Sequence, residues 1–258
     1  MTAEELPEVD AGYLFDHFYP INTDDRTGPC YEGWSALAFL AGRTERLRLG
    51  LIVAGVTYRH PTVLANMCAT IDQASRGRLE IGLGAAWNEI EHAAYGLEFP
   101  RVGVRMDMLD EALHVLDQLL TQDVSTFKGT HYTLTEARCE PKPVQSPRPP
   151  FLLGGQGEKR MLPIVAKWAD HYNYPGTSTE GLRQKLEVLQ ANCEAIGRDP
   201  KEIEVSMHLF SPSDPAQAAA DARQLVAAGC QNVIVYMQKS VDPTTIRDVT
   251  RAVADAIL

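Results

Sequence analysis

The sequence predicts an α/β fold built from parallel strands, and two short apolar runs carry this prediction. The runs are residues 46–57 and 78–88, and each is too short and too rich in glycine for a helix of normal length. Each is followed by a stretch with helical patterning. Alternating strands and helices imply parallel pairing through right-handed crossovers. Both runs end in small or polar residues, which are typical of a ligand site at the carboxyl ends of parallel strands.

The order of elements favours a TIM-type (β/α)₈ barrel over an open sheet, because the strand–helix unit recurs seven or eight times. Pro61 suits the first turn of a helix, and Gly197 and Gly229 suit the ends of two others. Strands are expected at residues 12–15, 47–53, 79–84, 151–154, 172–174, 203–209 and 232–236. Helices are expected at 34–42, 61–75, 88–95, 102–120, 157–169, 180–196, 215–228 and 242–257.

One segment, at about residues 121–150, interrupts this rhythm and is interpreted as an insertion into a single domain of residues 1–258. Its first part, residues 126–133, has the pattern of a hairpin with Lys128 and Gly129 near the turn. Its second part contains five prolines between Pro141 and Pro150 and predicts extended chain. An insertion near a barrel mouth is either a lid or substrate wall, or a surface excursion without function.

Composition excludes several classes of protein. The chain has 258 residues, of which 45% are hydrophobic and 22% charged, so it can form one large core. Its formal net charge of −10 disfavours binding to nucleic acid or to an anionic membrane surface. No run of roughly 18 apolar residues predicts a membrane span.

The cysteines and the first residues indicate a cytoplasmic protein. The five cysteines are far apart and form no Cys-x-x-Cys pair, which argues against a disulfide framework or a zinc site. The first eight residues are acidic and lack the apolar core of a signal peptide. No other histidine spacing indicates a metal site. Glu111 and His114 have Glu-x-x-His spacing and are interpreted as the solvated face of an amphipathic helix.

Candidate catalytic residues follow the predicted strands. His17 can exchange protons near neutral pH, although a strand-end histidine bonded to backbone is the alternative. Its neighbour Asp16 would point to the opposite face if the strand continued. Trp87 either stacks on a planar ligand or lies in the core. Asn88 either caps the next helix or binds a ligand. His60 is interpreted as a helix-entry residue, and the remaining histidines as structural.

Residues 154–157 (Gly-Gly-Gln-Gly) form a second candidate site. They precede a helix expected to start near Glu158, where free N–H groups and the helix dipole favour an anion such as phosphate. The alternative is a tight turn without a ligand. The segment has no Gly-Lys-Ser/Thr sequence and lacks the context of a dinucleotide fingerprint, so neither of those nucleotide sites is predicted.

The order of several motifs resembles the bacterial luciferase-like monooxygenase superfamily, and within it the oxidoreductases that use the deazaflavin coenzyme F420. Each motif alone is common, but together they are specific, and the resemblance covers roughly residues 13–240. The motifs are residues 15–18 (Phe-Asp-His-Phe), 44–50 (Thr-Glu-Arg-Leu-Arg-Leu-Gly), 59–61 (Arg-His-Pro), 77–84 (Gly-Arg-Leu-Glu-Ile-Gly-Leu-Gly), 87–89 (Trp-Asn-Glu) and 151–155 (Phe-Leu-Leu-Gly-Gly).

The resemblance implies a (β/α)₈ barrel that holds coenzyme F420, or alternatively FMN, at its mouth. It places His17 beside the reacting carbon as the catalytic residue, and it implies a cis peptide bond near Ile52–Val53. A small-molecule substrate and a homodimer are also implied. The cofactor-binding residues carried over are Asp16, Ile52, Val53, Ala54, Gly84, Trp87, Asn88, Gly154, Gly155 and Gln156.

Two departures from the family pattern limit what is carried over. The sugar-phosphate dehydrogenases of the family have a glutamate after the glycine that matches Gly84, whereas this chain has Ala85. Only about a dozen residues precede the first predicted strand, so the barrel is expected to lack its first strand and helix. Another subunit could cover the resulting gap, the first residues could substitute irregularly, or function could be impaired.

Three functions follow as hypotheses. The first is an oxidoreductase that transfers hydride between coenzyme F420 and a small organic substrate, with a proton relay through His17. The second keeps the fold but uses FMN and oxygen as a luciferase-like monooxygenase. The third is a non-catalytic or impaired barrel with a vestigial cofactor site.

Overall fold

The computed structural model describes residues 2–21, 25–210, 212–237 and 242–257. The chain divides into two compact units, one formed by Tyr13–Leu152 and the other by Met1–Gly12 with Leu153–Leu258. The predicted single domain of residues 1–258 stays a prediction. The chain passes between the units within strands β1 (Ala11–Leu14) and β7 (Phe151–Gly154).

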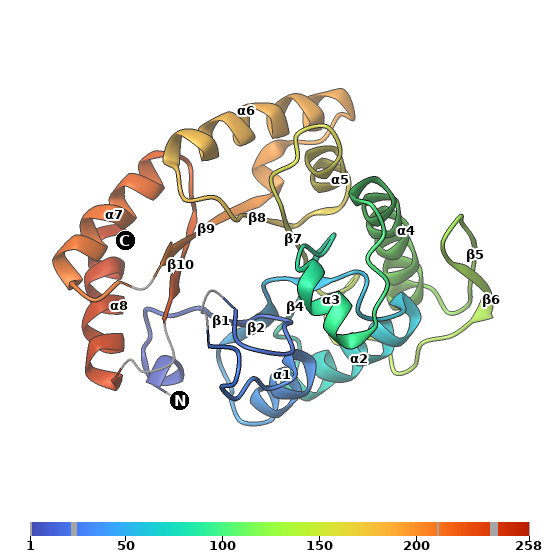
Figure 1. Cartoon of the computed structure of the whole chain (residues 1–258), viewed down its shortest axis with the longest axis horizontal. Helices are drawn as coiled ribbons and strands as arrows, with labels where there is room; N and C mark the ends of the chain where they lie inside the picture. The colour runs from blue at the N-terminus through green and yellow to red at the C-terminus, as the bar shows by residue number, and fades with distance from the viewer. Residues whose placement is uncertain (1, 22–24, 211, 238–241, 258) are drawn as a thin grey trace. The chain divides into compact units, whose positions relative to one another are not determined.

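The unit Tyr13–Leu152 alternates strands with helices, as the sequence predicts (Figure 1). Among its strands, β2 and β3 both pair in parallel with β4. All six residues of β4 are buried, as expected for a strand in a parallel sheet. The elements are α1 (Gly33–Ala41), β2 (Arg48–Leu51), β3 (Ala54–Gly55), α2 (Pro61–Ser75), β4 (Leu79–Gly84), α3 (Glu89–Tyr95), α4 (Val102–Thr121), β5 (Ser125–Lys128) and β6 (Thr133–Ala137).

The predicted strand at residues 47–53 is divided in two. Strand β2 ends at Leu51, the Ile52–Val53 peptide bond is cis, and β3 begins at Ala54. The family resemblance implied a cis bond at this position, and the structure has it. The packing against β4 is tight, because a Cβ atom on Gly82 would lie 1.6 Å from the backbone oxygen of Leu51. A side chain at position 82 would therefore displace the paired strand.

The predicted hairpin is present as the antiparallel pair β5–β6. The carboxylate of Glu111 on α4 accepts hydrogen bonds from the backbone N–H groups of Thr130, His131 and Tyr132 at 2.7, 2.8 and 3.1 Å. Burial opposes charge on Glu111, but these three donors hold its pKa below the usual range. Glu111 therefore ties the hairpin turn to the helix, instead of serving only as a solvated position.

A buried aspartate anchors the proline-rich segment. Asp72 on α2 has no exposed surface, and its carboxylate accepts hydrogen bonds from the backbone N–H groups of Val144 and Gln145 at 2.7 and 3.0 Å. The side-chain amide of Gln145 donates to it as well, at 2.7 Å. These charge-assisted bonds fix an extended segment that has little regular structure of its own.

We expect Asp72→Ala to lower the free energy of unfolding by about 3 kcal/mol, because it leaves buried N–H donors without an acceptor. Urea unfolding followed by circular dichroism measures this loss. Asp117→Ala is the matched control, since the half-exposed Asp117 pairs with Arg148 nearer the surface. Equal losses in the two variants would contradict the anchoring role of Asp72.

The second unit carries the rest of the parallel strands. Strands β8 and β10 both pair in parallel with β9, with Tyr172 opposite Val205 and Asn232 opposite Ser206. Its elements after β7 are α5 (Met161–Trp168), β8 (His171–Tyr174), α6 (Thr179–Ala195), η2 (Pro200–Glu202), β9 (Glu204–Phe210), α7 (Pro215–Ala227), β10 (Asn232–Tyr236) and α8 (Pro243–Ile257). Helices α7 and α8 enclose an apolar cluster that includes Ala222 and Val249.

The residues before β1 form the short 3₁₀ helix η1 (Thr2–Glu5) instead of a strand. Arg247 and Arg251 of α8 form ion pairs with Glu5 and Glu8, each at 3.3 Å. The first residues therefore contact α8 within their own unit. The proposed lack of a first strand and helix stays a prediction.

The structure also bears on the cysteines and on the question of a membrane-spanning helix. All five cysteines are free thiols, in agreement with the expected lack of a disulfide framework. Among the helices of the described ranges, none combines the length and apolarity that crossing a bilayer requires.

His208 on β9 makes the stability of this unit sensitive to acid. Its Nδ1 atom is buried without a hydrogen-bond partner, and its ring stacks on Phe210 at 5.3 Å. Burial lowers the pKa of His208 from 6.5 to about 4, because the charged imidazolium is poorly solvated there. The unfolded chain therefore binds this proton more readily than the folded chain between those two values.

We expect the stabilising effect of neutral His208 to be complete above pH 6.5 and to disappear as the pH falls toward 4. The loss should reach about 3 kcal/mol. Unfolding at several pH values measures it, with His208→Gln as the test and His60→Gln, at an exposed position, as the control. An unchanged pH dependence in His208→Gln would contradict this assignment.

Candidate active site

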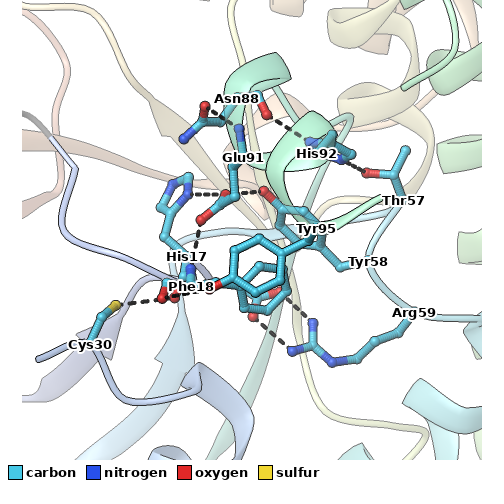
Figure 2. Close-up of polar contacts among 11 residues, drawn as sticks. His17, Phe18, Cys30, Thr57, Tyr58, Arg59, Asn88, Glu91, His92 and Tyr95 are labelled. Carbon is cyan, nitrogen blue, oxygen red and sulfur yellow. Dashed lines mark hydrogen bonds and ion pairs between the residues drawn. The ribbon is translucent and has the colours of Figure 1, made fainter. Parts of the chain in front are cut away.

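The site is built around His17, which follows the end of β1. The strand ends at Leu14, so Asp16 and His17 lie in irregular chain and are not held on opposite faces of a strand. Both are buried, with 1% and 8% of their surface exposed. They make separate contacts: the Nδ1 atom of His17 lies 2.8 Å from Oε2 of Glu91 on α3 (Figure 2).

Glu91 is a completely buried carboxylate with three donors around it. Besides His17, the backbone N–H of Phe18 donates to its Oε1 at 2.6 Å, and the hydroxyl of Tyr58 donates to its Oε2 at 2.5 Å. A buried carboxylate needs such partners to offset its loss of hydration. Burial and the nearby Glu91 raise the pKa of Tyr58, which keeps that hydroxyl protonated and donating.

Asp16 belongs to a second network. Arg59 donates to both of its oxygens, at 2.6 and 3.0 Å, and also contacts Glu32 at 2.5 Å. Glu32 in turn caps α1 by accepting from the N–H groups of Trp34 and Ser35. Burial raises the pKa of Asp16, while Arg59 acts in the opposite direction. The carboxylate of Asp16 is thus engaged with Arg59, and its predicted contact with a cofactor ring stays a prediction.

Helix α3 begins at the end of β4 and presents Glu91 to His17. The side-chain oxygen of Asn88 accepts from the backbone N–H of Glu91 at 3.2 Å, which confirms the capping alternative for Asn88. His92 donates from Nδ1 to the backbone oxygen of Asn88 at 2.7 Å, and its Nε2 contacts the hydroxyl of Thr57 at 2.6 Å (Figure 2). His92 is therefore structural, as predicted.

Trp87 is exposed to solvent over 63% of its surface, which excludes the core alternative. Its ring meets the ring of His17 edge-on, with centroids 5.5 Å apart. Phe15 lies on His17 as well, at 5.6 Å. Two aromatic rings therefore pack against His17, and the ring of Trp87 is exposed to solvent.

The predicted cofactor residues of this unit lie at adjoining strand ends. Ala54 stands opposite Leu83 in the register of β3 and β4, so Ile52, Val53 and Ala54 lie beside the end of β4 at Gly84. The N–H of Val56 donates to the backbone oxygen of Gly84 at 3.0 Å. The next residue, Ala85, accepts from Arg105 through its backbone oxygen at 2.9 Å.

Gly154, Gly155 and Gln156 lie in the other unit, where the local geometry differs from the prediction. Helix α5 begins at Met161 instead of residue 157, because a turn occupies residues 158–160. The N–H groups of Met161 and Leu162 both donate to the oxygen of Gly157. The bond from Met161 to Gly157 has the i to i−4 spacing of the first hydrogen bond of a helix, so it does not decide whether the preceding N–H groups bind an anion. Phosphate binding at this loop stays a prediction.

Several functional candidates were missed from the sequence, namely Glu91, Tyr58, Arg59 and Glu32. A signal for Glu91 was present, because Asn88-x-x-Glu91 has the spacing of a helix capping box. In a capping box the glutamate returns to the backbone of its own helix, whereas here it reaches Phe18 and His17. Tyr58 and Arg59 lie in irregular chain, where no periodic pattern predicts which way a side chain points.

The fold and the site define an α/β protein with a titratable imidazole at the carboxyl ends of parallel strands. The family model for luciferase-like monooxygenases matches residues 14–252. The chain therefore belongs to the luciferase-like monooxygenase family.

Curated relatives include proteins of two kinds. An F420-dependent glucose-6-phosphate dehydrogenase from Kineococcus radiotolerans is 33% identical over 226 residues, covering 83% of this chain and 64% of the relative. A pyrimidine monooxygenase from Allorhizobium ampelinum is 33% identical over 175 residues, covering 65% of this chain and 46% of the relative. The matches thus span from about half to just under two thirds of the length of these relatives.

Solved structures show the fold. The F420-dependent tetrahydromethanopterin reductase from Methanopyrus kandleri superposes with a TM-score of 0.83 over 100% of this chain and 93% of its own, at 17% identity. An F420-dependent secondary alcohol dehydrogenase superposes with a TM-score of 0.75 over 99% and 77%, at 25% identity. The predicted α/β fold of the luciferase-like TIM-barrel type is thereby confirmed.

We expect Arg59→Leu to lower the free energy of unfolding by about 3–5 kcal/mol at pH 7, because it leaves Asp16 buried and charged without its partner. The loss should shrink as the pH falls, since a proton on Asp16 removes the uncompensated charge. Chemical unfolding at pH 7 and at pH 5 measures both effects. Adding Asp16→Asn to Arg59→Leu should recover part of the loss, and a double variant no more stable than the single one would contradict this account.

Proposed function

We propose that the chain is an oxidoreductase that transfers hydride between coenzyme F420 and a small organic substrate, with His17 exchanging the proton. One observation carries the proposal. Nδ1 of His17 is held by buried Glu91, while its Nε2 has no hydrogen-bond partner among the described residues, next to the exposed ring of Trp87. The names of the F420-dependent relatives support the choice of cofactor.

The residues around His17 fit a deazaflavin or a flavin by their chemistry. Such a ring has apolar faces and a polar edge, and the site offers an exposed indole, an imidazole and half-buried backbone at Ile52–Val53. When bound, the cofactor supplies the carbon that accepts or gives hydride. In the unit that holds His17, the proposed cofactor residues are Asp16, Ile52, Val53, Ala54, Gly84, Trp87 and Asn88. The cofactor contact predicted for Gly154, Gly155 and Gln156 is a separate prediction for the other unit.

His17 then acts as the proton-exchanging residue. When a substrate alcohol is oxidised, its carbon loses hydride and its oxygen loses a proton, and Nε2 of His17 receives that proton. In the reverse direction the same atom protonates the oxygen of the carbonyl. His17 itself is buried, with 8% of its surface exposed, which limits its exchange of protons with bulk water and suits a relay at a fixed atom.

We propose a small alcohol or ketone as the substrate class, and a sugar phosphate is disfavoured. At position 85 the methyl group of alanine replaces the glutamate that the resemblance assigns to the sugar-phosphate dehydrogenases. The alcohol dehydrogenase among the similar structures supports the smaller substrate.

The homodimer implied by the resemblance stays a prediction, which sedimentation velocity can measure.

We expect His17→Ala to lower the rate of hydride transfer by roughly 10²–10⁴-fold, because the substrate oxygen loses its proton acceptor. The absorbance of coenzyme F420 measures the rate, and its fluorescence measures binding, which should stay at micromolar affinity. His60→Ala is the matched control, since His60 caps α2 at an exposed position. Activity that survives in His17→Ala would overturn the role of His17.

A second candidate function is an FMN-dependent monooxygenase, favoured by the pyrimidine monooxygenase relative. Titration with coenzyme F420 and with FMN, followed by measurement of oxygen consumption, discriminates the two. Tight binding of FMN with oxygen uptake would replace the proposal. If a folded, monodisperse sample binds neither cofactor, the third hypothesis of an impaired barrel would be favoured.

A further inference from the structure

We propose that Glu91 is a positioning residue that holds His17 in its Nδ1–H tautomer and thereby leaves Nε2 as the proton-accepting atom. This inference rests on the proposed function, because it assigns the atom through which His17 would act. Glu91 itself is too deeply buried, behind His17, to meet a substrate. Its effect on the reaction therefore passes through the imidazole.

The donors around Glu91 determine the direction of the hydrogen bond. The backbone N–H of Phe18 can only donate, and it occupies Oε1 of Glu91. The hydroxyl of Tyr58 and Nδ1 of His17 share Oε2 at 2.5 and 2.8 Å. An ionised carboxylate accepts at both oxygens, so every contact is satisfied when Nδ1 of His17 carries the proton. A neutral imidazole then has its lone pair at Nε2.

The surroundings of His17 restrict the ring to this orientation. The thiol of Cys30 donates to the backbone oxygen of His17 at 3.2 Å, while Phe15 and Trp87 pack against the ring. A rotation of the ring that broke the contact with Glu91 would leave a buried carboxylate with one donor fewer, which is costly. The orientation of the ring and its tautomer therefore depend on the same bond.

The charged and titratable groups near His17 come from four segments of the chain. Glu91 and Tyr58 share its hydrogen-bond network, from α3 and from the loop after β3. Asp16 is the preceding residue, and its charge is opposed by Arg59. Cys30 contacts the backbone of His17 and not its ring. Of these groups, only Glu91 makes a hydrogen bond to the imidazole.

Glu91→Gln separates positioning from a purely structural role. The amide keeps the shape of the side chain but has one acceptor oxygen, which the N–H of Phe18 and the hydroxyl of Tyr58 compete to occupy. When the NH₂ group faces Nδ1 of His17, that atom must accept, and the proton moves to Nε2. Tyr58→Phe is the matched control, because it removes one donor to Glu91 without touching the bond to His17.

The test is nitrogen NMR of ¹⁵N-histidine-labelled protein without any cofactor, with the His17 signals assigned by their loss in His17→Gln. His92 is an internal reference, since its Nδ1 donates to a backbone oxygen and must carry a proton. We expect the Nδ1–H form of His17 in the wild type and in Tyr58→Phe, and a shift toward the Nε2–H form in Glu91→Gln. An Nε2–H form in the wild type would overturn the proposal, even if Glu91→Gln failed to fold.

Kinetics provide the second measurement. We expect Glu91→Gln to lower kcat by roughly 10²–10⁴-fold, as for His17→Ala, with the affinity for coenzyme F420 unchanged. A Glu91→Gln variant that keeps both the Nδ1–H form and full kcat would overturn the proposal. If the tautomers behave as expected but no cofactor binds, the positioning by Glu91 stands and the proposed function fails.

Discussion

The buried carboxylate of Glu91 is the interaction on which the candidate site depends. It accepts from three groups that are distant in sequence: the imidazole of His17, the backbone of Phe18 and the hydroxyl of Tyr58. Removing such a carboxylate from water is costly, and three donors offset that cost only when they converge. The carboxylate thus holds the chain after β1, the loop after β3 and helix α3 in one arrangement.

A second polar network stabilises the same region and has a different chemistry. Asp16 and Glu32 share Arg59, so a single guanidinium joins the chain after β1 to the N-cap residue of α1. The guanidinium of Arg59 binds two carboxylates, whereas Nε2 of His17 has no hydrogen-bond partner among the described residues. The neighbours Asp16 and His17 therefore differ in role: Asp16 is engaged in holding the structure, and His17 has an atom available for chemistry.

The fold was predictable from local patterns, and the site was predictable in part. Strand β4 and helices α2 and α4 follow from apolar periodicity, which depends on nearby residues. Periodicity did not show that α5 begins only at Met161, because the glycines before it permit a turn as readily as a helix. His17 was identifiable from its residue type and its place after a strand. Glu91 was not, because its partners lie 33 to 74 positions away and a glutamate in a first helical turn is usually solvated.

The central claim is that a planar cofactor ring lies against Trp87 and His17. The most direct measurement is the set of indole N–H signals of the three tryptophans in an NMR titration with coenzyme F420. Trp34 is fully buried and serves as the internal reference, while Trp87 is exposed beside His17. The account predicts that the Trp87 signal shifts in a saturable manner while the Trp34 signal stays in place. Saturable binding that leaves the Trp87 signal unchanged would contradict it.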